Sequence, residues 1–299
     1  MSRLLEALHS GRVLLMDGAM GTELQRRGLK DGEPPELWNL THPEEVRAVH
    51  RAYVEAGAEI LVTNTFQADP ASLQRRGLKR RMKAIWDSAL KHARSARKAR
   101  PIVLADVGPC EMGNTVRYGA LLDTCRRADG LLLETWNWDA PEILHFSVFN
   151  RRWYARKTPF LVSIAFGRTA GKRRRAEAAT VAFVDGERQR ADALGVNCGK
   201  NIDMDDILEI VRAYRDWSDL PIFIRPNAGT PRRTTTGWKY PRSPEYMADK
   251  LWPLLEAGVT MVGGCCGTTP AHIAAFRKVI DEWNARNTSR PAPQTPRRG

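Results

Sequence analysis

The stretch Glu256-Ala257-Gly258-Val259-Thr260-Met261-Val262-Gly263-Gly264-Cys265-Cys266-Gly267 contains the pattern that decides the fold class. Its first three residues are typical of a helix end, where glycine allows a tight turn into the next element. The run Val259 to Val262 is short, apolar and rich in β-branched residues, as expected for a buried strand. The segment therefore predicts a helix, a turn and a strand whose carboxyl end carries two thiols.

The same unit recurs along the chain. Similar turns rich in small residues occur at 55–58, 127–130 and 191–195. Eight apolar runs of this kind can be found: Val13 to Met16, Glu59 to Thr63, Ile102 to Ala105, Leu131 to Leu133, Phe160 to Ile164, Leu194 to Asn197, Ile222 to Ile224 and Val259 to Val262. The intervals between them are long enough for crossover helices, which predicts parallel strands. Eight such units in 299 residues favour an α/β fold with a single (β/α)8 TIM barrel, which commonly uses about 250 residues.

The domain organisation follows from this count. Residues 1–286 are predicted to form the barrel. The segment 287–299 is basic and rich in proline, a composition typical of disorder. We expect one folded domain followed by a disordered tail.

The formal net charge of +13 is high and would permit nonspecific contact with nucleic acid or anionic membranes. Basic residues gather at 75–83, 91–100, 172–175 and in the tail. The sequence has no recognisable nucleic-acid-binding module, so a solvated basic surface is favoured over a nucleic-acid partner. A nucleic-acid-associated protein is kept as an alternative that steeply salt-dependent binding would support.

Cysteine usage and apolar content bear on the compartment. The five cysteines are odd in number, and the chain begins without the apolar segment of a secretory signal. Both features favour reduced thiols in a cytosol-like compartment. No window approaches the roughly 20 apolar residues of a membrane span. We expect a soluble, cytoplasmic protein without a membrane partner.

Residues with chemical character follow the predicted strands, and barrel enzymes build their sites on these loops. The segments concerned are Asp17 to Thr22, Thr63 to Gln67, Asp106 to Pro109, Glu134-Thr135, Cys198, Arg225 to Gly229 and Cys265-Cys266. We therefore expect one functional site at the carboxyl ends of the strands.

Cys198, Cys265 and Cys266 are the predicted metal ligands. Each stands at a strand end beside glycine. Three thiolates suit a zinc ion that keeps its fourth tetrahedral position open, the arrangement of a catalytic site. The alternatives are buried apolar cysteines or a strained disulfide between the adjacent pair. Cys110 and Cys125 have no comparable support.

The chain resembles the homocysteine S-methyltransferases. The resemblance rests on motifs spread from about Leu14 to Ile280: Asp17-Gly18-Ala19-Met20-Gly21-Thr22, Leu37 to Pro43, Ala56-Gly57-Ala58, Thr63-Asn64-Thr65-Phe66, Val196-Asn197-Cys198 and Gly263 to Pro270. The family includes betaine-homocysteine methyltransferase, S-methylmethionine-dependent enzymes and the homocysteine-binding module of cobalamin-dependent methionine synthase. The resemblance implies a zinc-containing barrel that transfers a methyl group to the sulfur of L-homocysteine and produces methionine.

This chemistry agrees with the behaviour of thiols. A free alkyl thiol has a pKa of about 8.5 and is a weak nucleophile at neutral pH. Zinc removes the proton, so the expected nucleophile is the zinc-activated substrate thiolate, with no further catalytic side chain. An unpaired Glu134 would be costly to bury at a strand end and needs a cation. The resemblance implies that Glu134 and Asp17 receive the α-ammonium group.

The remaining substrate contacts are expected in two loops. The resemblance implies that backbone amides of Gly18, Ala19 and Met20 hold the carboxylate, and a glycine-containing turn can present N–H groups to an anion. Asn227 is expected to line the pocket or support it, although such residues also stabilise turns.

The methyl donor is left open between S-methylmethionine, S-adenosylmethionine, betaine and methylcobalamin. Cationic donors favour an aromatic cage, for which the candidates are Trp38, Phe66, Trp136, Trp138 and Trp238. The family pattern is not followed everywhere: Asp106 stands where serine is often found, and the loop after the fifth strand is basic. A corrinoid-dependent reaction would need a separate corrinoid protein. The other possibility is a noncatalytic barrel that binds zinc and thiols.

Overall fold

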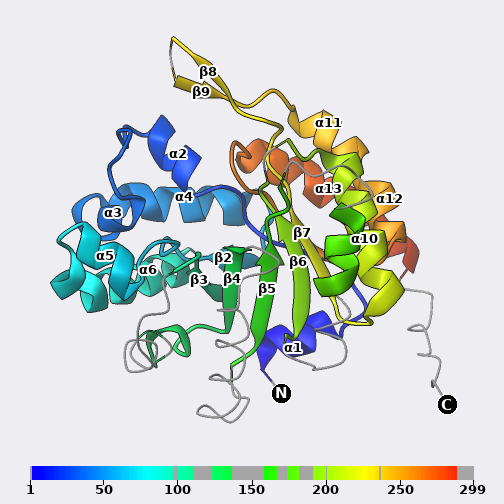
Figure 1. Cartoon of the computed structure of the whole chain (residues 1–299), viewed down its shortest axis with the longest axis horizontal. Coiled ribbons are helices and arrows are strands. Elements are labelled where there is room, and N and C mark those ends of the chain that lie inside the picture. Colours follow the sequence, from blue (N-terminus) through cyan, green and yellow to red (C-terminus); the bar gives the residue numbers. More distant parts are fainter. Residues whose placement is uncertain are drawn as a thin grey trace.

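A parallel β-barrel forms the centre of the computed structural model (Figure 1). The structure describes residues 2–96, 100–110, 121, 123–136, 158–167, 174–181, 191–199, 201–235 and 237–287. The barrel strands are β1 (Leu14–Leu15), β2 (Ile60–Val62), β3 (Ile102–Val107), β4 (Gly130–Trp136), β5 (Phe160–Ile164), β6 (Ala193–Asn197), β7 (Ile222–Arg225) and β10 (Val259–Val262). Each predicted run overlaps one of these strands, although β3, β4, β6 and β7 extend beyond their runs, and the predicted (β/α)8 barrel is confirmed.

Strand pairing brings the two ends of the chain together. The strands follow the order β1-β10-β7-β6-β5-β4-β3-β2, and all pair in parallel. Leu14 pairs with Met261 of β10, and a bridge between Met16 and Ile60 links β1 to β2. The barrel therefore closes, and its first and last strands become neighbours.

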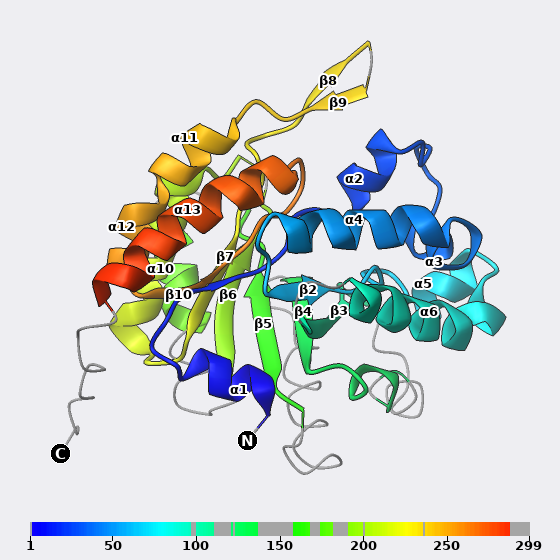
Figure 2. The ribbon, with the colours of Figure 1, turned by 180° about the vertical axis from the view of Figure 1, so that it is seen from behind.

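Helices cover the outside of the barrel (Figure 2). They are α1 (Arg3–Leu8), α2 (Gly21–Arg26), α3 (Trp38–Thr41), α4 (Pro43–Glu55), α5 (Pro70–Arg75), α6 (Met82–Ser95), α10 (Met204–Trp217), α11 (Pro244–Asp249), α12 (Leu251–Glu256) and α13 (Pro270–Asn287), with short 3-10 turns at Pro35–Leu37 and Lys79–Arg81. Local sequence explains several starts. Pro43 and Pro270 each stand at the first helical residue, and Asp203 and Asp206 form a capping box at α10.

Two apolar layers stabilise the fold. Outward-facing strand residues pack against the helices, and inward-facing residues such as Leu104 and Phe223 fill the barrel. Leu4 and Leu8 of α1 belong to this inner cluster, so α1 covers the amino-terminal end of the barrel. This leaves the opposite end, where the strands terminate, for the functional site.

A small hairpin was not predicted. Strands β8 (Arg232–Thr234) and β9 (Gly237–Lys239) pair antiparallel and project from the carboxyl end of the barrel (Figures 1 and 2). No helix among the described residues has the length and apolarity to cross a membrane. The predicted tail, apart from Asn287 at the end of α13, lies outside the described residues.

Candidate functional site

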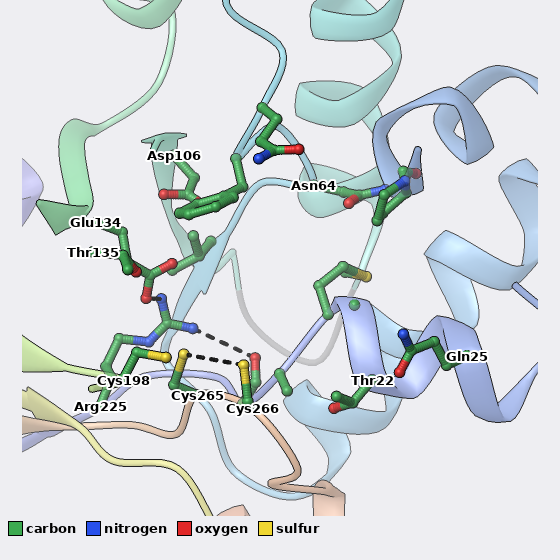
Figure 3. A pocket seen from close by; sticks show the side chains of 18 of the residues that line it. Thr22, Gln25, Asn64, Asp106, Glu134, Thr135, Cys198, Arg225, Cys265 and Cys266 are labelled. Atoms are coloured by element: carbon green, nitrogen blue, oxygen red, sulfur yellow. Dashed lines mark hydrogen bonds and ion pairs between the residues drawn. The ribbon is translucent and has the colours of Figure 1, made fainter. Parts of the chain in front are cut away.

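A cavity of about 550 Å³ opens at the carboxyl ends of the strands (Figure 3). Its walls come from the α2 segment, the loop after β2, the ends of several barrel strands and the β8–β9 hairpin. The residues that line it include Gly18, Ala19, Met20, Thr63, Thr65, Phe66, Asp106, Glu134, Cys198, Arg225, Trp238, Cys265 and Cys266. The site thus lies where the sequence predicted it.

Cys198, Cys265 and Cys266 meet at one wall of this cavity. Their sulfur atoms all lie within 4.8 Å of one another, and the sulfurs of the adjacent pair are 4.0 Å apart. A disulfide bond is about 2.05 Å long, so the adjacent cysteines are separate thiols. Within the described part of the chain, these residues form the one His, Cys, Asp or Glu group suited to a metal ion. The arrangement is that of a metal site.

Backbone geometry fixes the direction of the three thiols. Cys198 has a φ of 47°, in the left-handed region that few residues other than glycine adopt. A Cβ atom at Gly264 would lie 2.3 Å from the Thr268 hydroxyl oxygen, so only glycine fits before the cysteine pair. The same hydroxyl donates to the carbonyl oxygen of Cys265 at 2.8 Å. The loop is thereby held against its own helix start.

Side-chain amides from two strand ends face the sulfurs. Asn227 Nδ2 lies 3.5 Å from Cys198 Sγ, and Asn197 Nδ2 lies 3.9 Å from Cys265 Sγ. Asn197 is fully buried; its Oδ1 accepts from Ser163 at 2.6 Å, and its Nδ2 donates to Thr135 Oγ1 at 2.7 Å. Asn227 was predicted to line or support the pocket; it contacts Cys198 and is not among the residues that line the cavity. No role was predicted for Asn197. A buried asparagine directly before a ligand cysteine was the available signal.

The thiols influence one another's protonation. Hydrogen bonds from Cys265 and Cys266 lower the pKa of Cys198. The hydrogen bond with Cys198 is also the main reason why the pKa of Cys265 and that of Cys266 are raised. The hydrogen bonds among the thiols therefore favour a thiolate at Cys198 over one at Cys265 or Cys266. A cation bound there would displace the thiol protons.

Arg225 is the central cation of the cavity, and sequence analysis did not assign it a role. It stands at the end of β7 and is buried. One guanidinium nitrogen lies 2.6 Å from Glu134 Oε1, and another lies 3.3 Å from Asp17 Oδ1. The cation that a buried Glu134 was predicted to need is thus already supplied in part by the protein.

Asp17 lies behind the cavity wall and does not line the cavity. Its Oδ2 accepts the amide hydrogen of Val62 at 2.8 Å, while its Oδ1 faces Arg225. Both carboxylate oxygens therefore have protein partners. Asp17 is thus joined to the cavity lining through Arg225 and the backbone of Val62.

The turn of Gly18, Ala19 and Met20 lines the cavity as predicted, but its amides are not equivalent. The Ala19 amide donates to the Thr268 hydroxyl at 3.1 Å. A Cβ atom at Gly18 would lie 2.8 Å from the Tyr53 side chain, so glycine is required here by packing. The Ala19 amide therefore already has a protein acceptor.

Burial dominates the protonation of the carboxyl groups. Desolvation raises the pKa of Asp17, of Asp106 and of Glu134, and Arg225 opposes the shift in each case. The negative charge of Glu134 further raises the pKa of Asp106. The cavity therefore holds more carboxyl groups than its one guanidinium can neutralise.

Two of the predicted aromatic residues, Phe66 and Trp238, line the cavity. Trp38 and Trp136 are buried; Trp38 stacks on His42, and the Trp136 indole donates to the Val107 carbonyl oxygen. Trp138 and residues 168–173 of the loop after β5 lie outside the described residues. An aromatic contact with a ligand is therefore available from Phe66 and Trp238.

Comparison with known proteins gives a consistent family. Residues 14–280 match the model of the homocysteine S-methyltransferase family. The homocysteine S-methyltransferase of Escherichia coli is 30% identical, with 89% of this chain and 94% of that protein covered. The methionine synthase of Mycobacterium tuberculosis is also 30% identical over 95% of this chain. The chain spans only about a quarter (26%) of that protein's length.

The fold comparison agrees. The metallated form of the Escherichia coli homocysteine methyltransferase MmuM has a TM-score of 0.72 at 26% identity, covering 91% of this chain and 99% of that one. Its oxidised form has a TM-score of 0.70 at 28% identity, covering 92% and 98%. The match to the family model and the similarity to the Escherichia coli enzyme show that the chain belongs to the homocysteine S-methyltransferase family.

Proposed function

We propose that this protein transfers a methyl group to the sulfur of L-homocysteine and releases methionine. The observation that carries the proposal is the cluster of Cys198, Cys265 and Cys266 on the wall of a cavity that also presents Glu134. A thiol substrate could place its sulfur at the cluster and its amino-acid group across the cavity. Family membership supports the same reaction.

Zinc is the proposed metal. A tetrahedral ion with zinc–sulfur bonds of about 2.3 Å separates its sulfur ligands by about 3.8 Å. The 4.0 Å between the sulfurs of Cys265 and Cys266 fits this spacing, and three thiolates leave one position open. Bound zinc would supply a Lewis-acidic centre that holds a fourth thiol in its thiolate form. The amides of Asn197 and Asn227 would donate to the protein sulfurs and moderate their charge.

The protein residues would orient the amino acid. Glu134, which lines the cavity, would accept from the α-ammonium group, and the Gly18 and Met20 amides would donate to the carboxylate. Asp17, assigned from sequence to the ammonium group, would act from behind by holding Arg225. Together these contacts would direct the sulfur toward the methyl donor. The dependence on three reduced thiols favours a cytoplasmic location.

The donor is proposed to enter beside Phe66 and Trp238. Aromatic faces suit the sulfonium of S-methylmethionine or S-adenosylmethionine and the quaternary ammonium of betaine. A methylcobalamin donor is the alternative, because the chain matches about a quarter of a methionine synthase. In that case a separate corrinoid protein would present the methyl group.

Methionine formation tests the proposal. Purified, zinc-loaded protein is given homocysteine with each of the four donors in turn, and its zinc content is measured in parallel. Turnover with one donor would support the reaction and identify the branch. Zinc binding without turnover would favour a corrinoid partner or a noncatalytic thiol-binding barrel. Absence of both zinc and turnover would contradict the proposal.

A further inference from the structure

Asp106 is a buried carboxyl group that the reaction described above does not use. It lies on β3, lines the cavity and is only 4% exposed. Its backbone is fixed on both sides: its amide donates to Thr63 Oγ1 at 3.0 Å, and its carbonyl oxygen accepts from Thr65 Oγ1 at 2.8 Å. The side chain is therefore held in place in the cavity wall.

One oxygen of Asp106 has no protein partner. Its Oδ1 is buried and makes no hydrogen bond within the described residues. Leaving such an atom unpaired is costly, because a buried carboxylate loses its water without receiving a donor in exchange. Asp106 lines a cavity in which a ligand could supply the missing donor.

The protein's own cation is already engaged. Arg225 faces Glu134 at 2.6 Å and Asp17 at 3.3 Å, and its second nitrogen also lies 3.4 Å from the Gly18 carbonyl oxygen. No ion pair joins Asp106 to a described lysine or arginine within 4.0 Å. Arg225 thus pairs with Asp17 and Glu134, and Asp106, which lines the cavity together with Glu134, is left without a direct cation among the described residues.

Asp106 also lies beside Glu134. A hydrogen bond with Asp106 is among the influences on Glu134, and Figure 3 shows the two side chains on the same side of the cavity. A primary ammonium has three N–H donors and one positive charge. It could donate to both carboxyl groups at once and replace the proton that two neighbouring carboxylates would otherwise share.

We infer, on the basis of the proposed function, that Asp106 and Glu134 together receive the α-ammonium group of homocysteine. Asp106 is then a substrate-specificity residue, whereas Asp17 supports the cavity through Arg225. This assignment predicts discrimination against thiols that lack an amino group.

The experiment compares two ligands on zinc-loaded protein by titration calorimetry. The ligands are homocysteine and 4-mercaptobutanoate, which has hydrogen in place of the amino group. The wild-type protein should prefer homocysteine. Asp106→Asn should weaken homocysteine binding by about tenfold or more and leave the analogue within about twofold, because a charge-assisted hydrogen bond is lost only with the former. A second variant, Asp106→Ser, should show the same selective loss of homocysteine binding as Asp106→Asn.

Asp69→Asn is the matched control. Asp69 is also a buried aspartate with one unpaired carboxylate oxygen, but it caps α5 and does not line the cavity. Asparagine keeps that cap, so discrimination should stay at the wild-type level. Zinc content and melting temperature confirm that each variant is folded.

The outcomes separate the two claims. If the wild-type protein prefers homocysteine and the folded Asp106 variants keep that preference, the assignment of Asp106 is overturned while the proposed function stands. If the zinc-loaded wild-type protein binds neither thiol, the proposed function fails and the assignment fails with it.

Discussion

Arg225 is the residue on which the electrostatics of the cavity depend. Its guanidinium contacts Asp17 and Glu134, and all three side chains are buried. Arg225→Met should lower the free energy of unfolding by about 3–5 kcal/mol, because it leaves two buried carboxyl groups without their cation. Urea denaturation at fixed zinc concentration measures the change.

A compensating variant tests this explanation. Adding Asp17→Asn to Arg225→Met should recover part of the lost stability, since one of the uncompensated charges is removed. If the two substitutions simply add in their cost, the coupling between these residues is not electrostatic.

Cys265 carries the prediction for the metal. Cys265→Ala should reduce zinc from about one ion per chain to a small fraction, because two thiolates bind zinc far more weakly than three. The barrel should remain folded, since most of its core lies away from this loop. Elemental analysis and circular dichroism give the two readouts. Cys110→Ser, outside the thiol cluster, is the control and should keep its zinc; full zinc retention by Cys265→Ala would contradict the ligand assignment.

The roles of individual residues could be predicted only where one residue type determines the chemistry. Three cysteines at two strand ends indicated a metal because few other functions need that pattern. Arg225 gave no such signal. Its partners lie at positions 17 and 134, so its role depends on barrel closure and on the inward direction of one side chain. Asp17 was assigned to the ligand from the family resemblance, and its contacts with Arg225 and the Val62 amide could not be predicted because they depend on how distant strands meet in the barrel.

At the scale of elements, α4 contains a buried histidine with a consequence for acid stability. His50 is fully buried, and both ring nitrogens lack a partner within the described residues. Burial lowers its pKa to about 3. The folded state therefore keeps His50 neutral, while the unfolded chain gains a proton once the pH falls below about 6.5. The stability that depends on neutral His50 is present above that pH and is lost as the pH falls toward 3.

His50→Met tests this effect. Between pH 7 and pH 5, the wild-type protein should lose about 2 kcal/mol more unfolding free energy than the variant does. Chemical denaturation at both pH values measures the difference. Equal losses would show that His50 is protonated in the folded state or has found a partner.

The strands were predictable because each is a short apolar run between turns, and this signal does not depend on distant contacts. Their ends were less predictable. β4 continues through Glu134 and Thr135 to Trp136, where polar residues interrupt the apolar pattern. The β8–β9 hairpin could not be recognised, since its strands are three residues long and largely exposed. The polar residues at the end of β4 indicated a functional site, but they also made the end of that strand difficult to predict.

At the scale of the whole molecule, the β8–β9 hairpin forms a wall of the cavity beyond the barrel. Trp238 lines the cavity and is 49% exposed. Trp238→Ala should lower kcat/KM for a cationic donor by about tenfold, because an aromatic contact with the donor is lost. Zinc content and the Kd for homocysteine should be unchanged. Trp217→Ala removes another well-exposed ring among the described residues, at the end of α10, and should have no effect.

The position of α1 over the amino-terminal end of the barrel has a kinetic consequence. With Leu4 and Leu8 packed into the amino-terminal end of the barrel, both reactants must use the opposite opening. The thiol cluster stands at the strand ends, whereas Trp238 belongs to the projecting hairpin. A donor seated beside Trp238 would block the path of the amino acid, so we expect compulsory-order kinetics in which homocysteine binds first and methionine leaves last. Product-inhibition measurements test this order: methionine should inhibit competitively with respect to homocysteine, and no other pair of product and substrate should compete. A random-order pattern would mean that the amino acid can pass a bound donor.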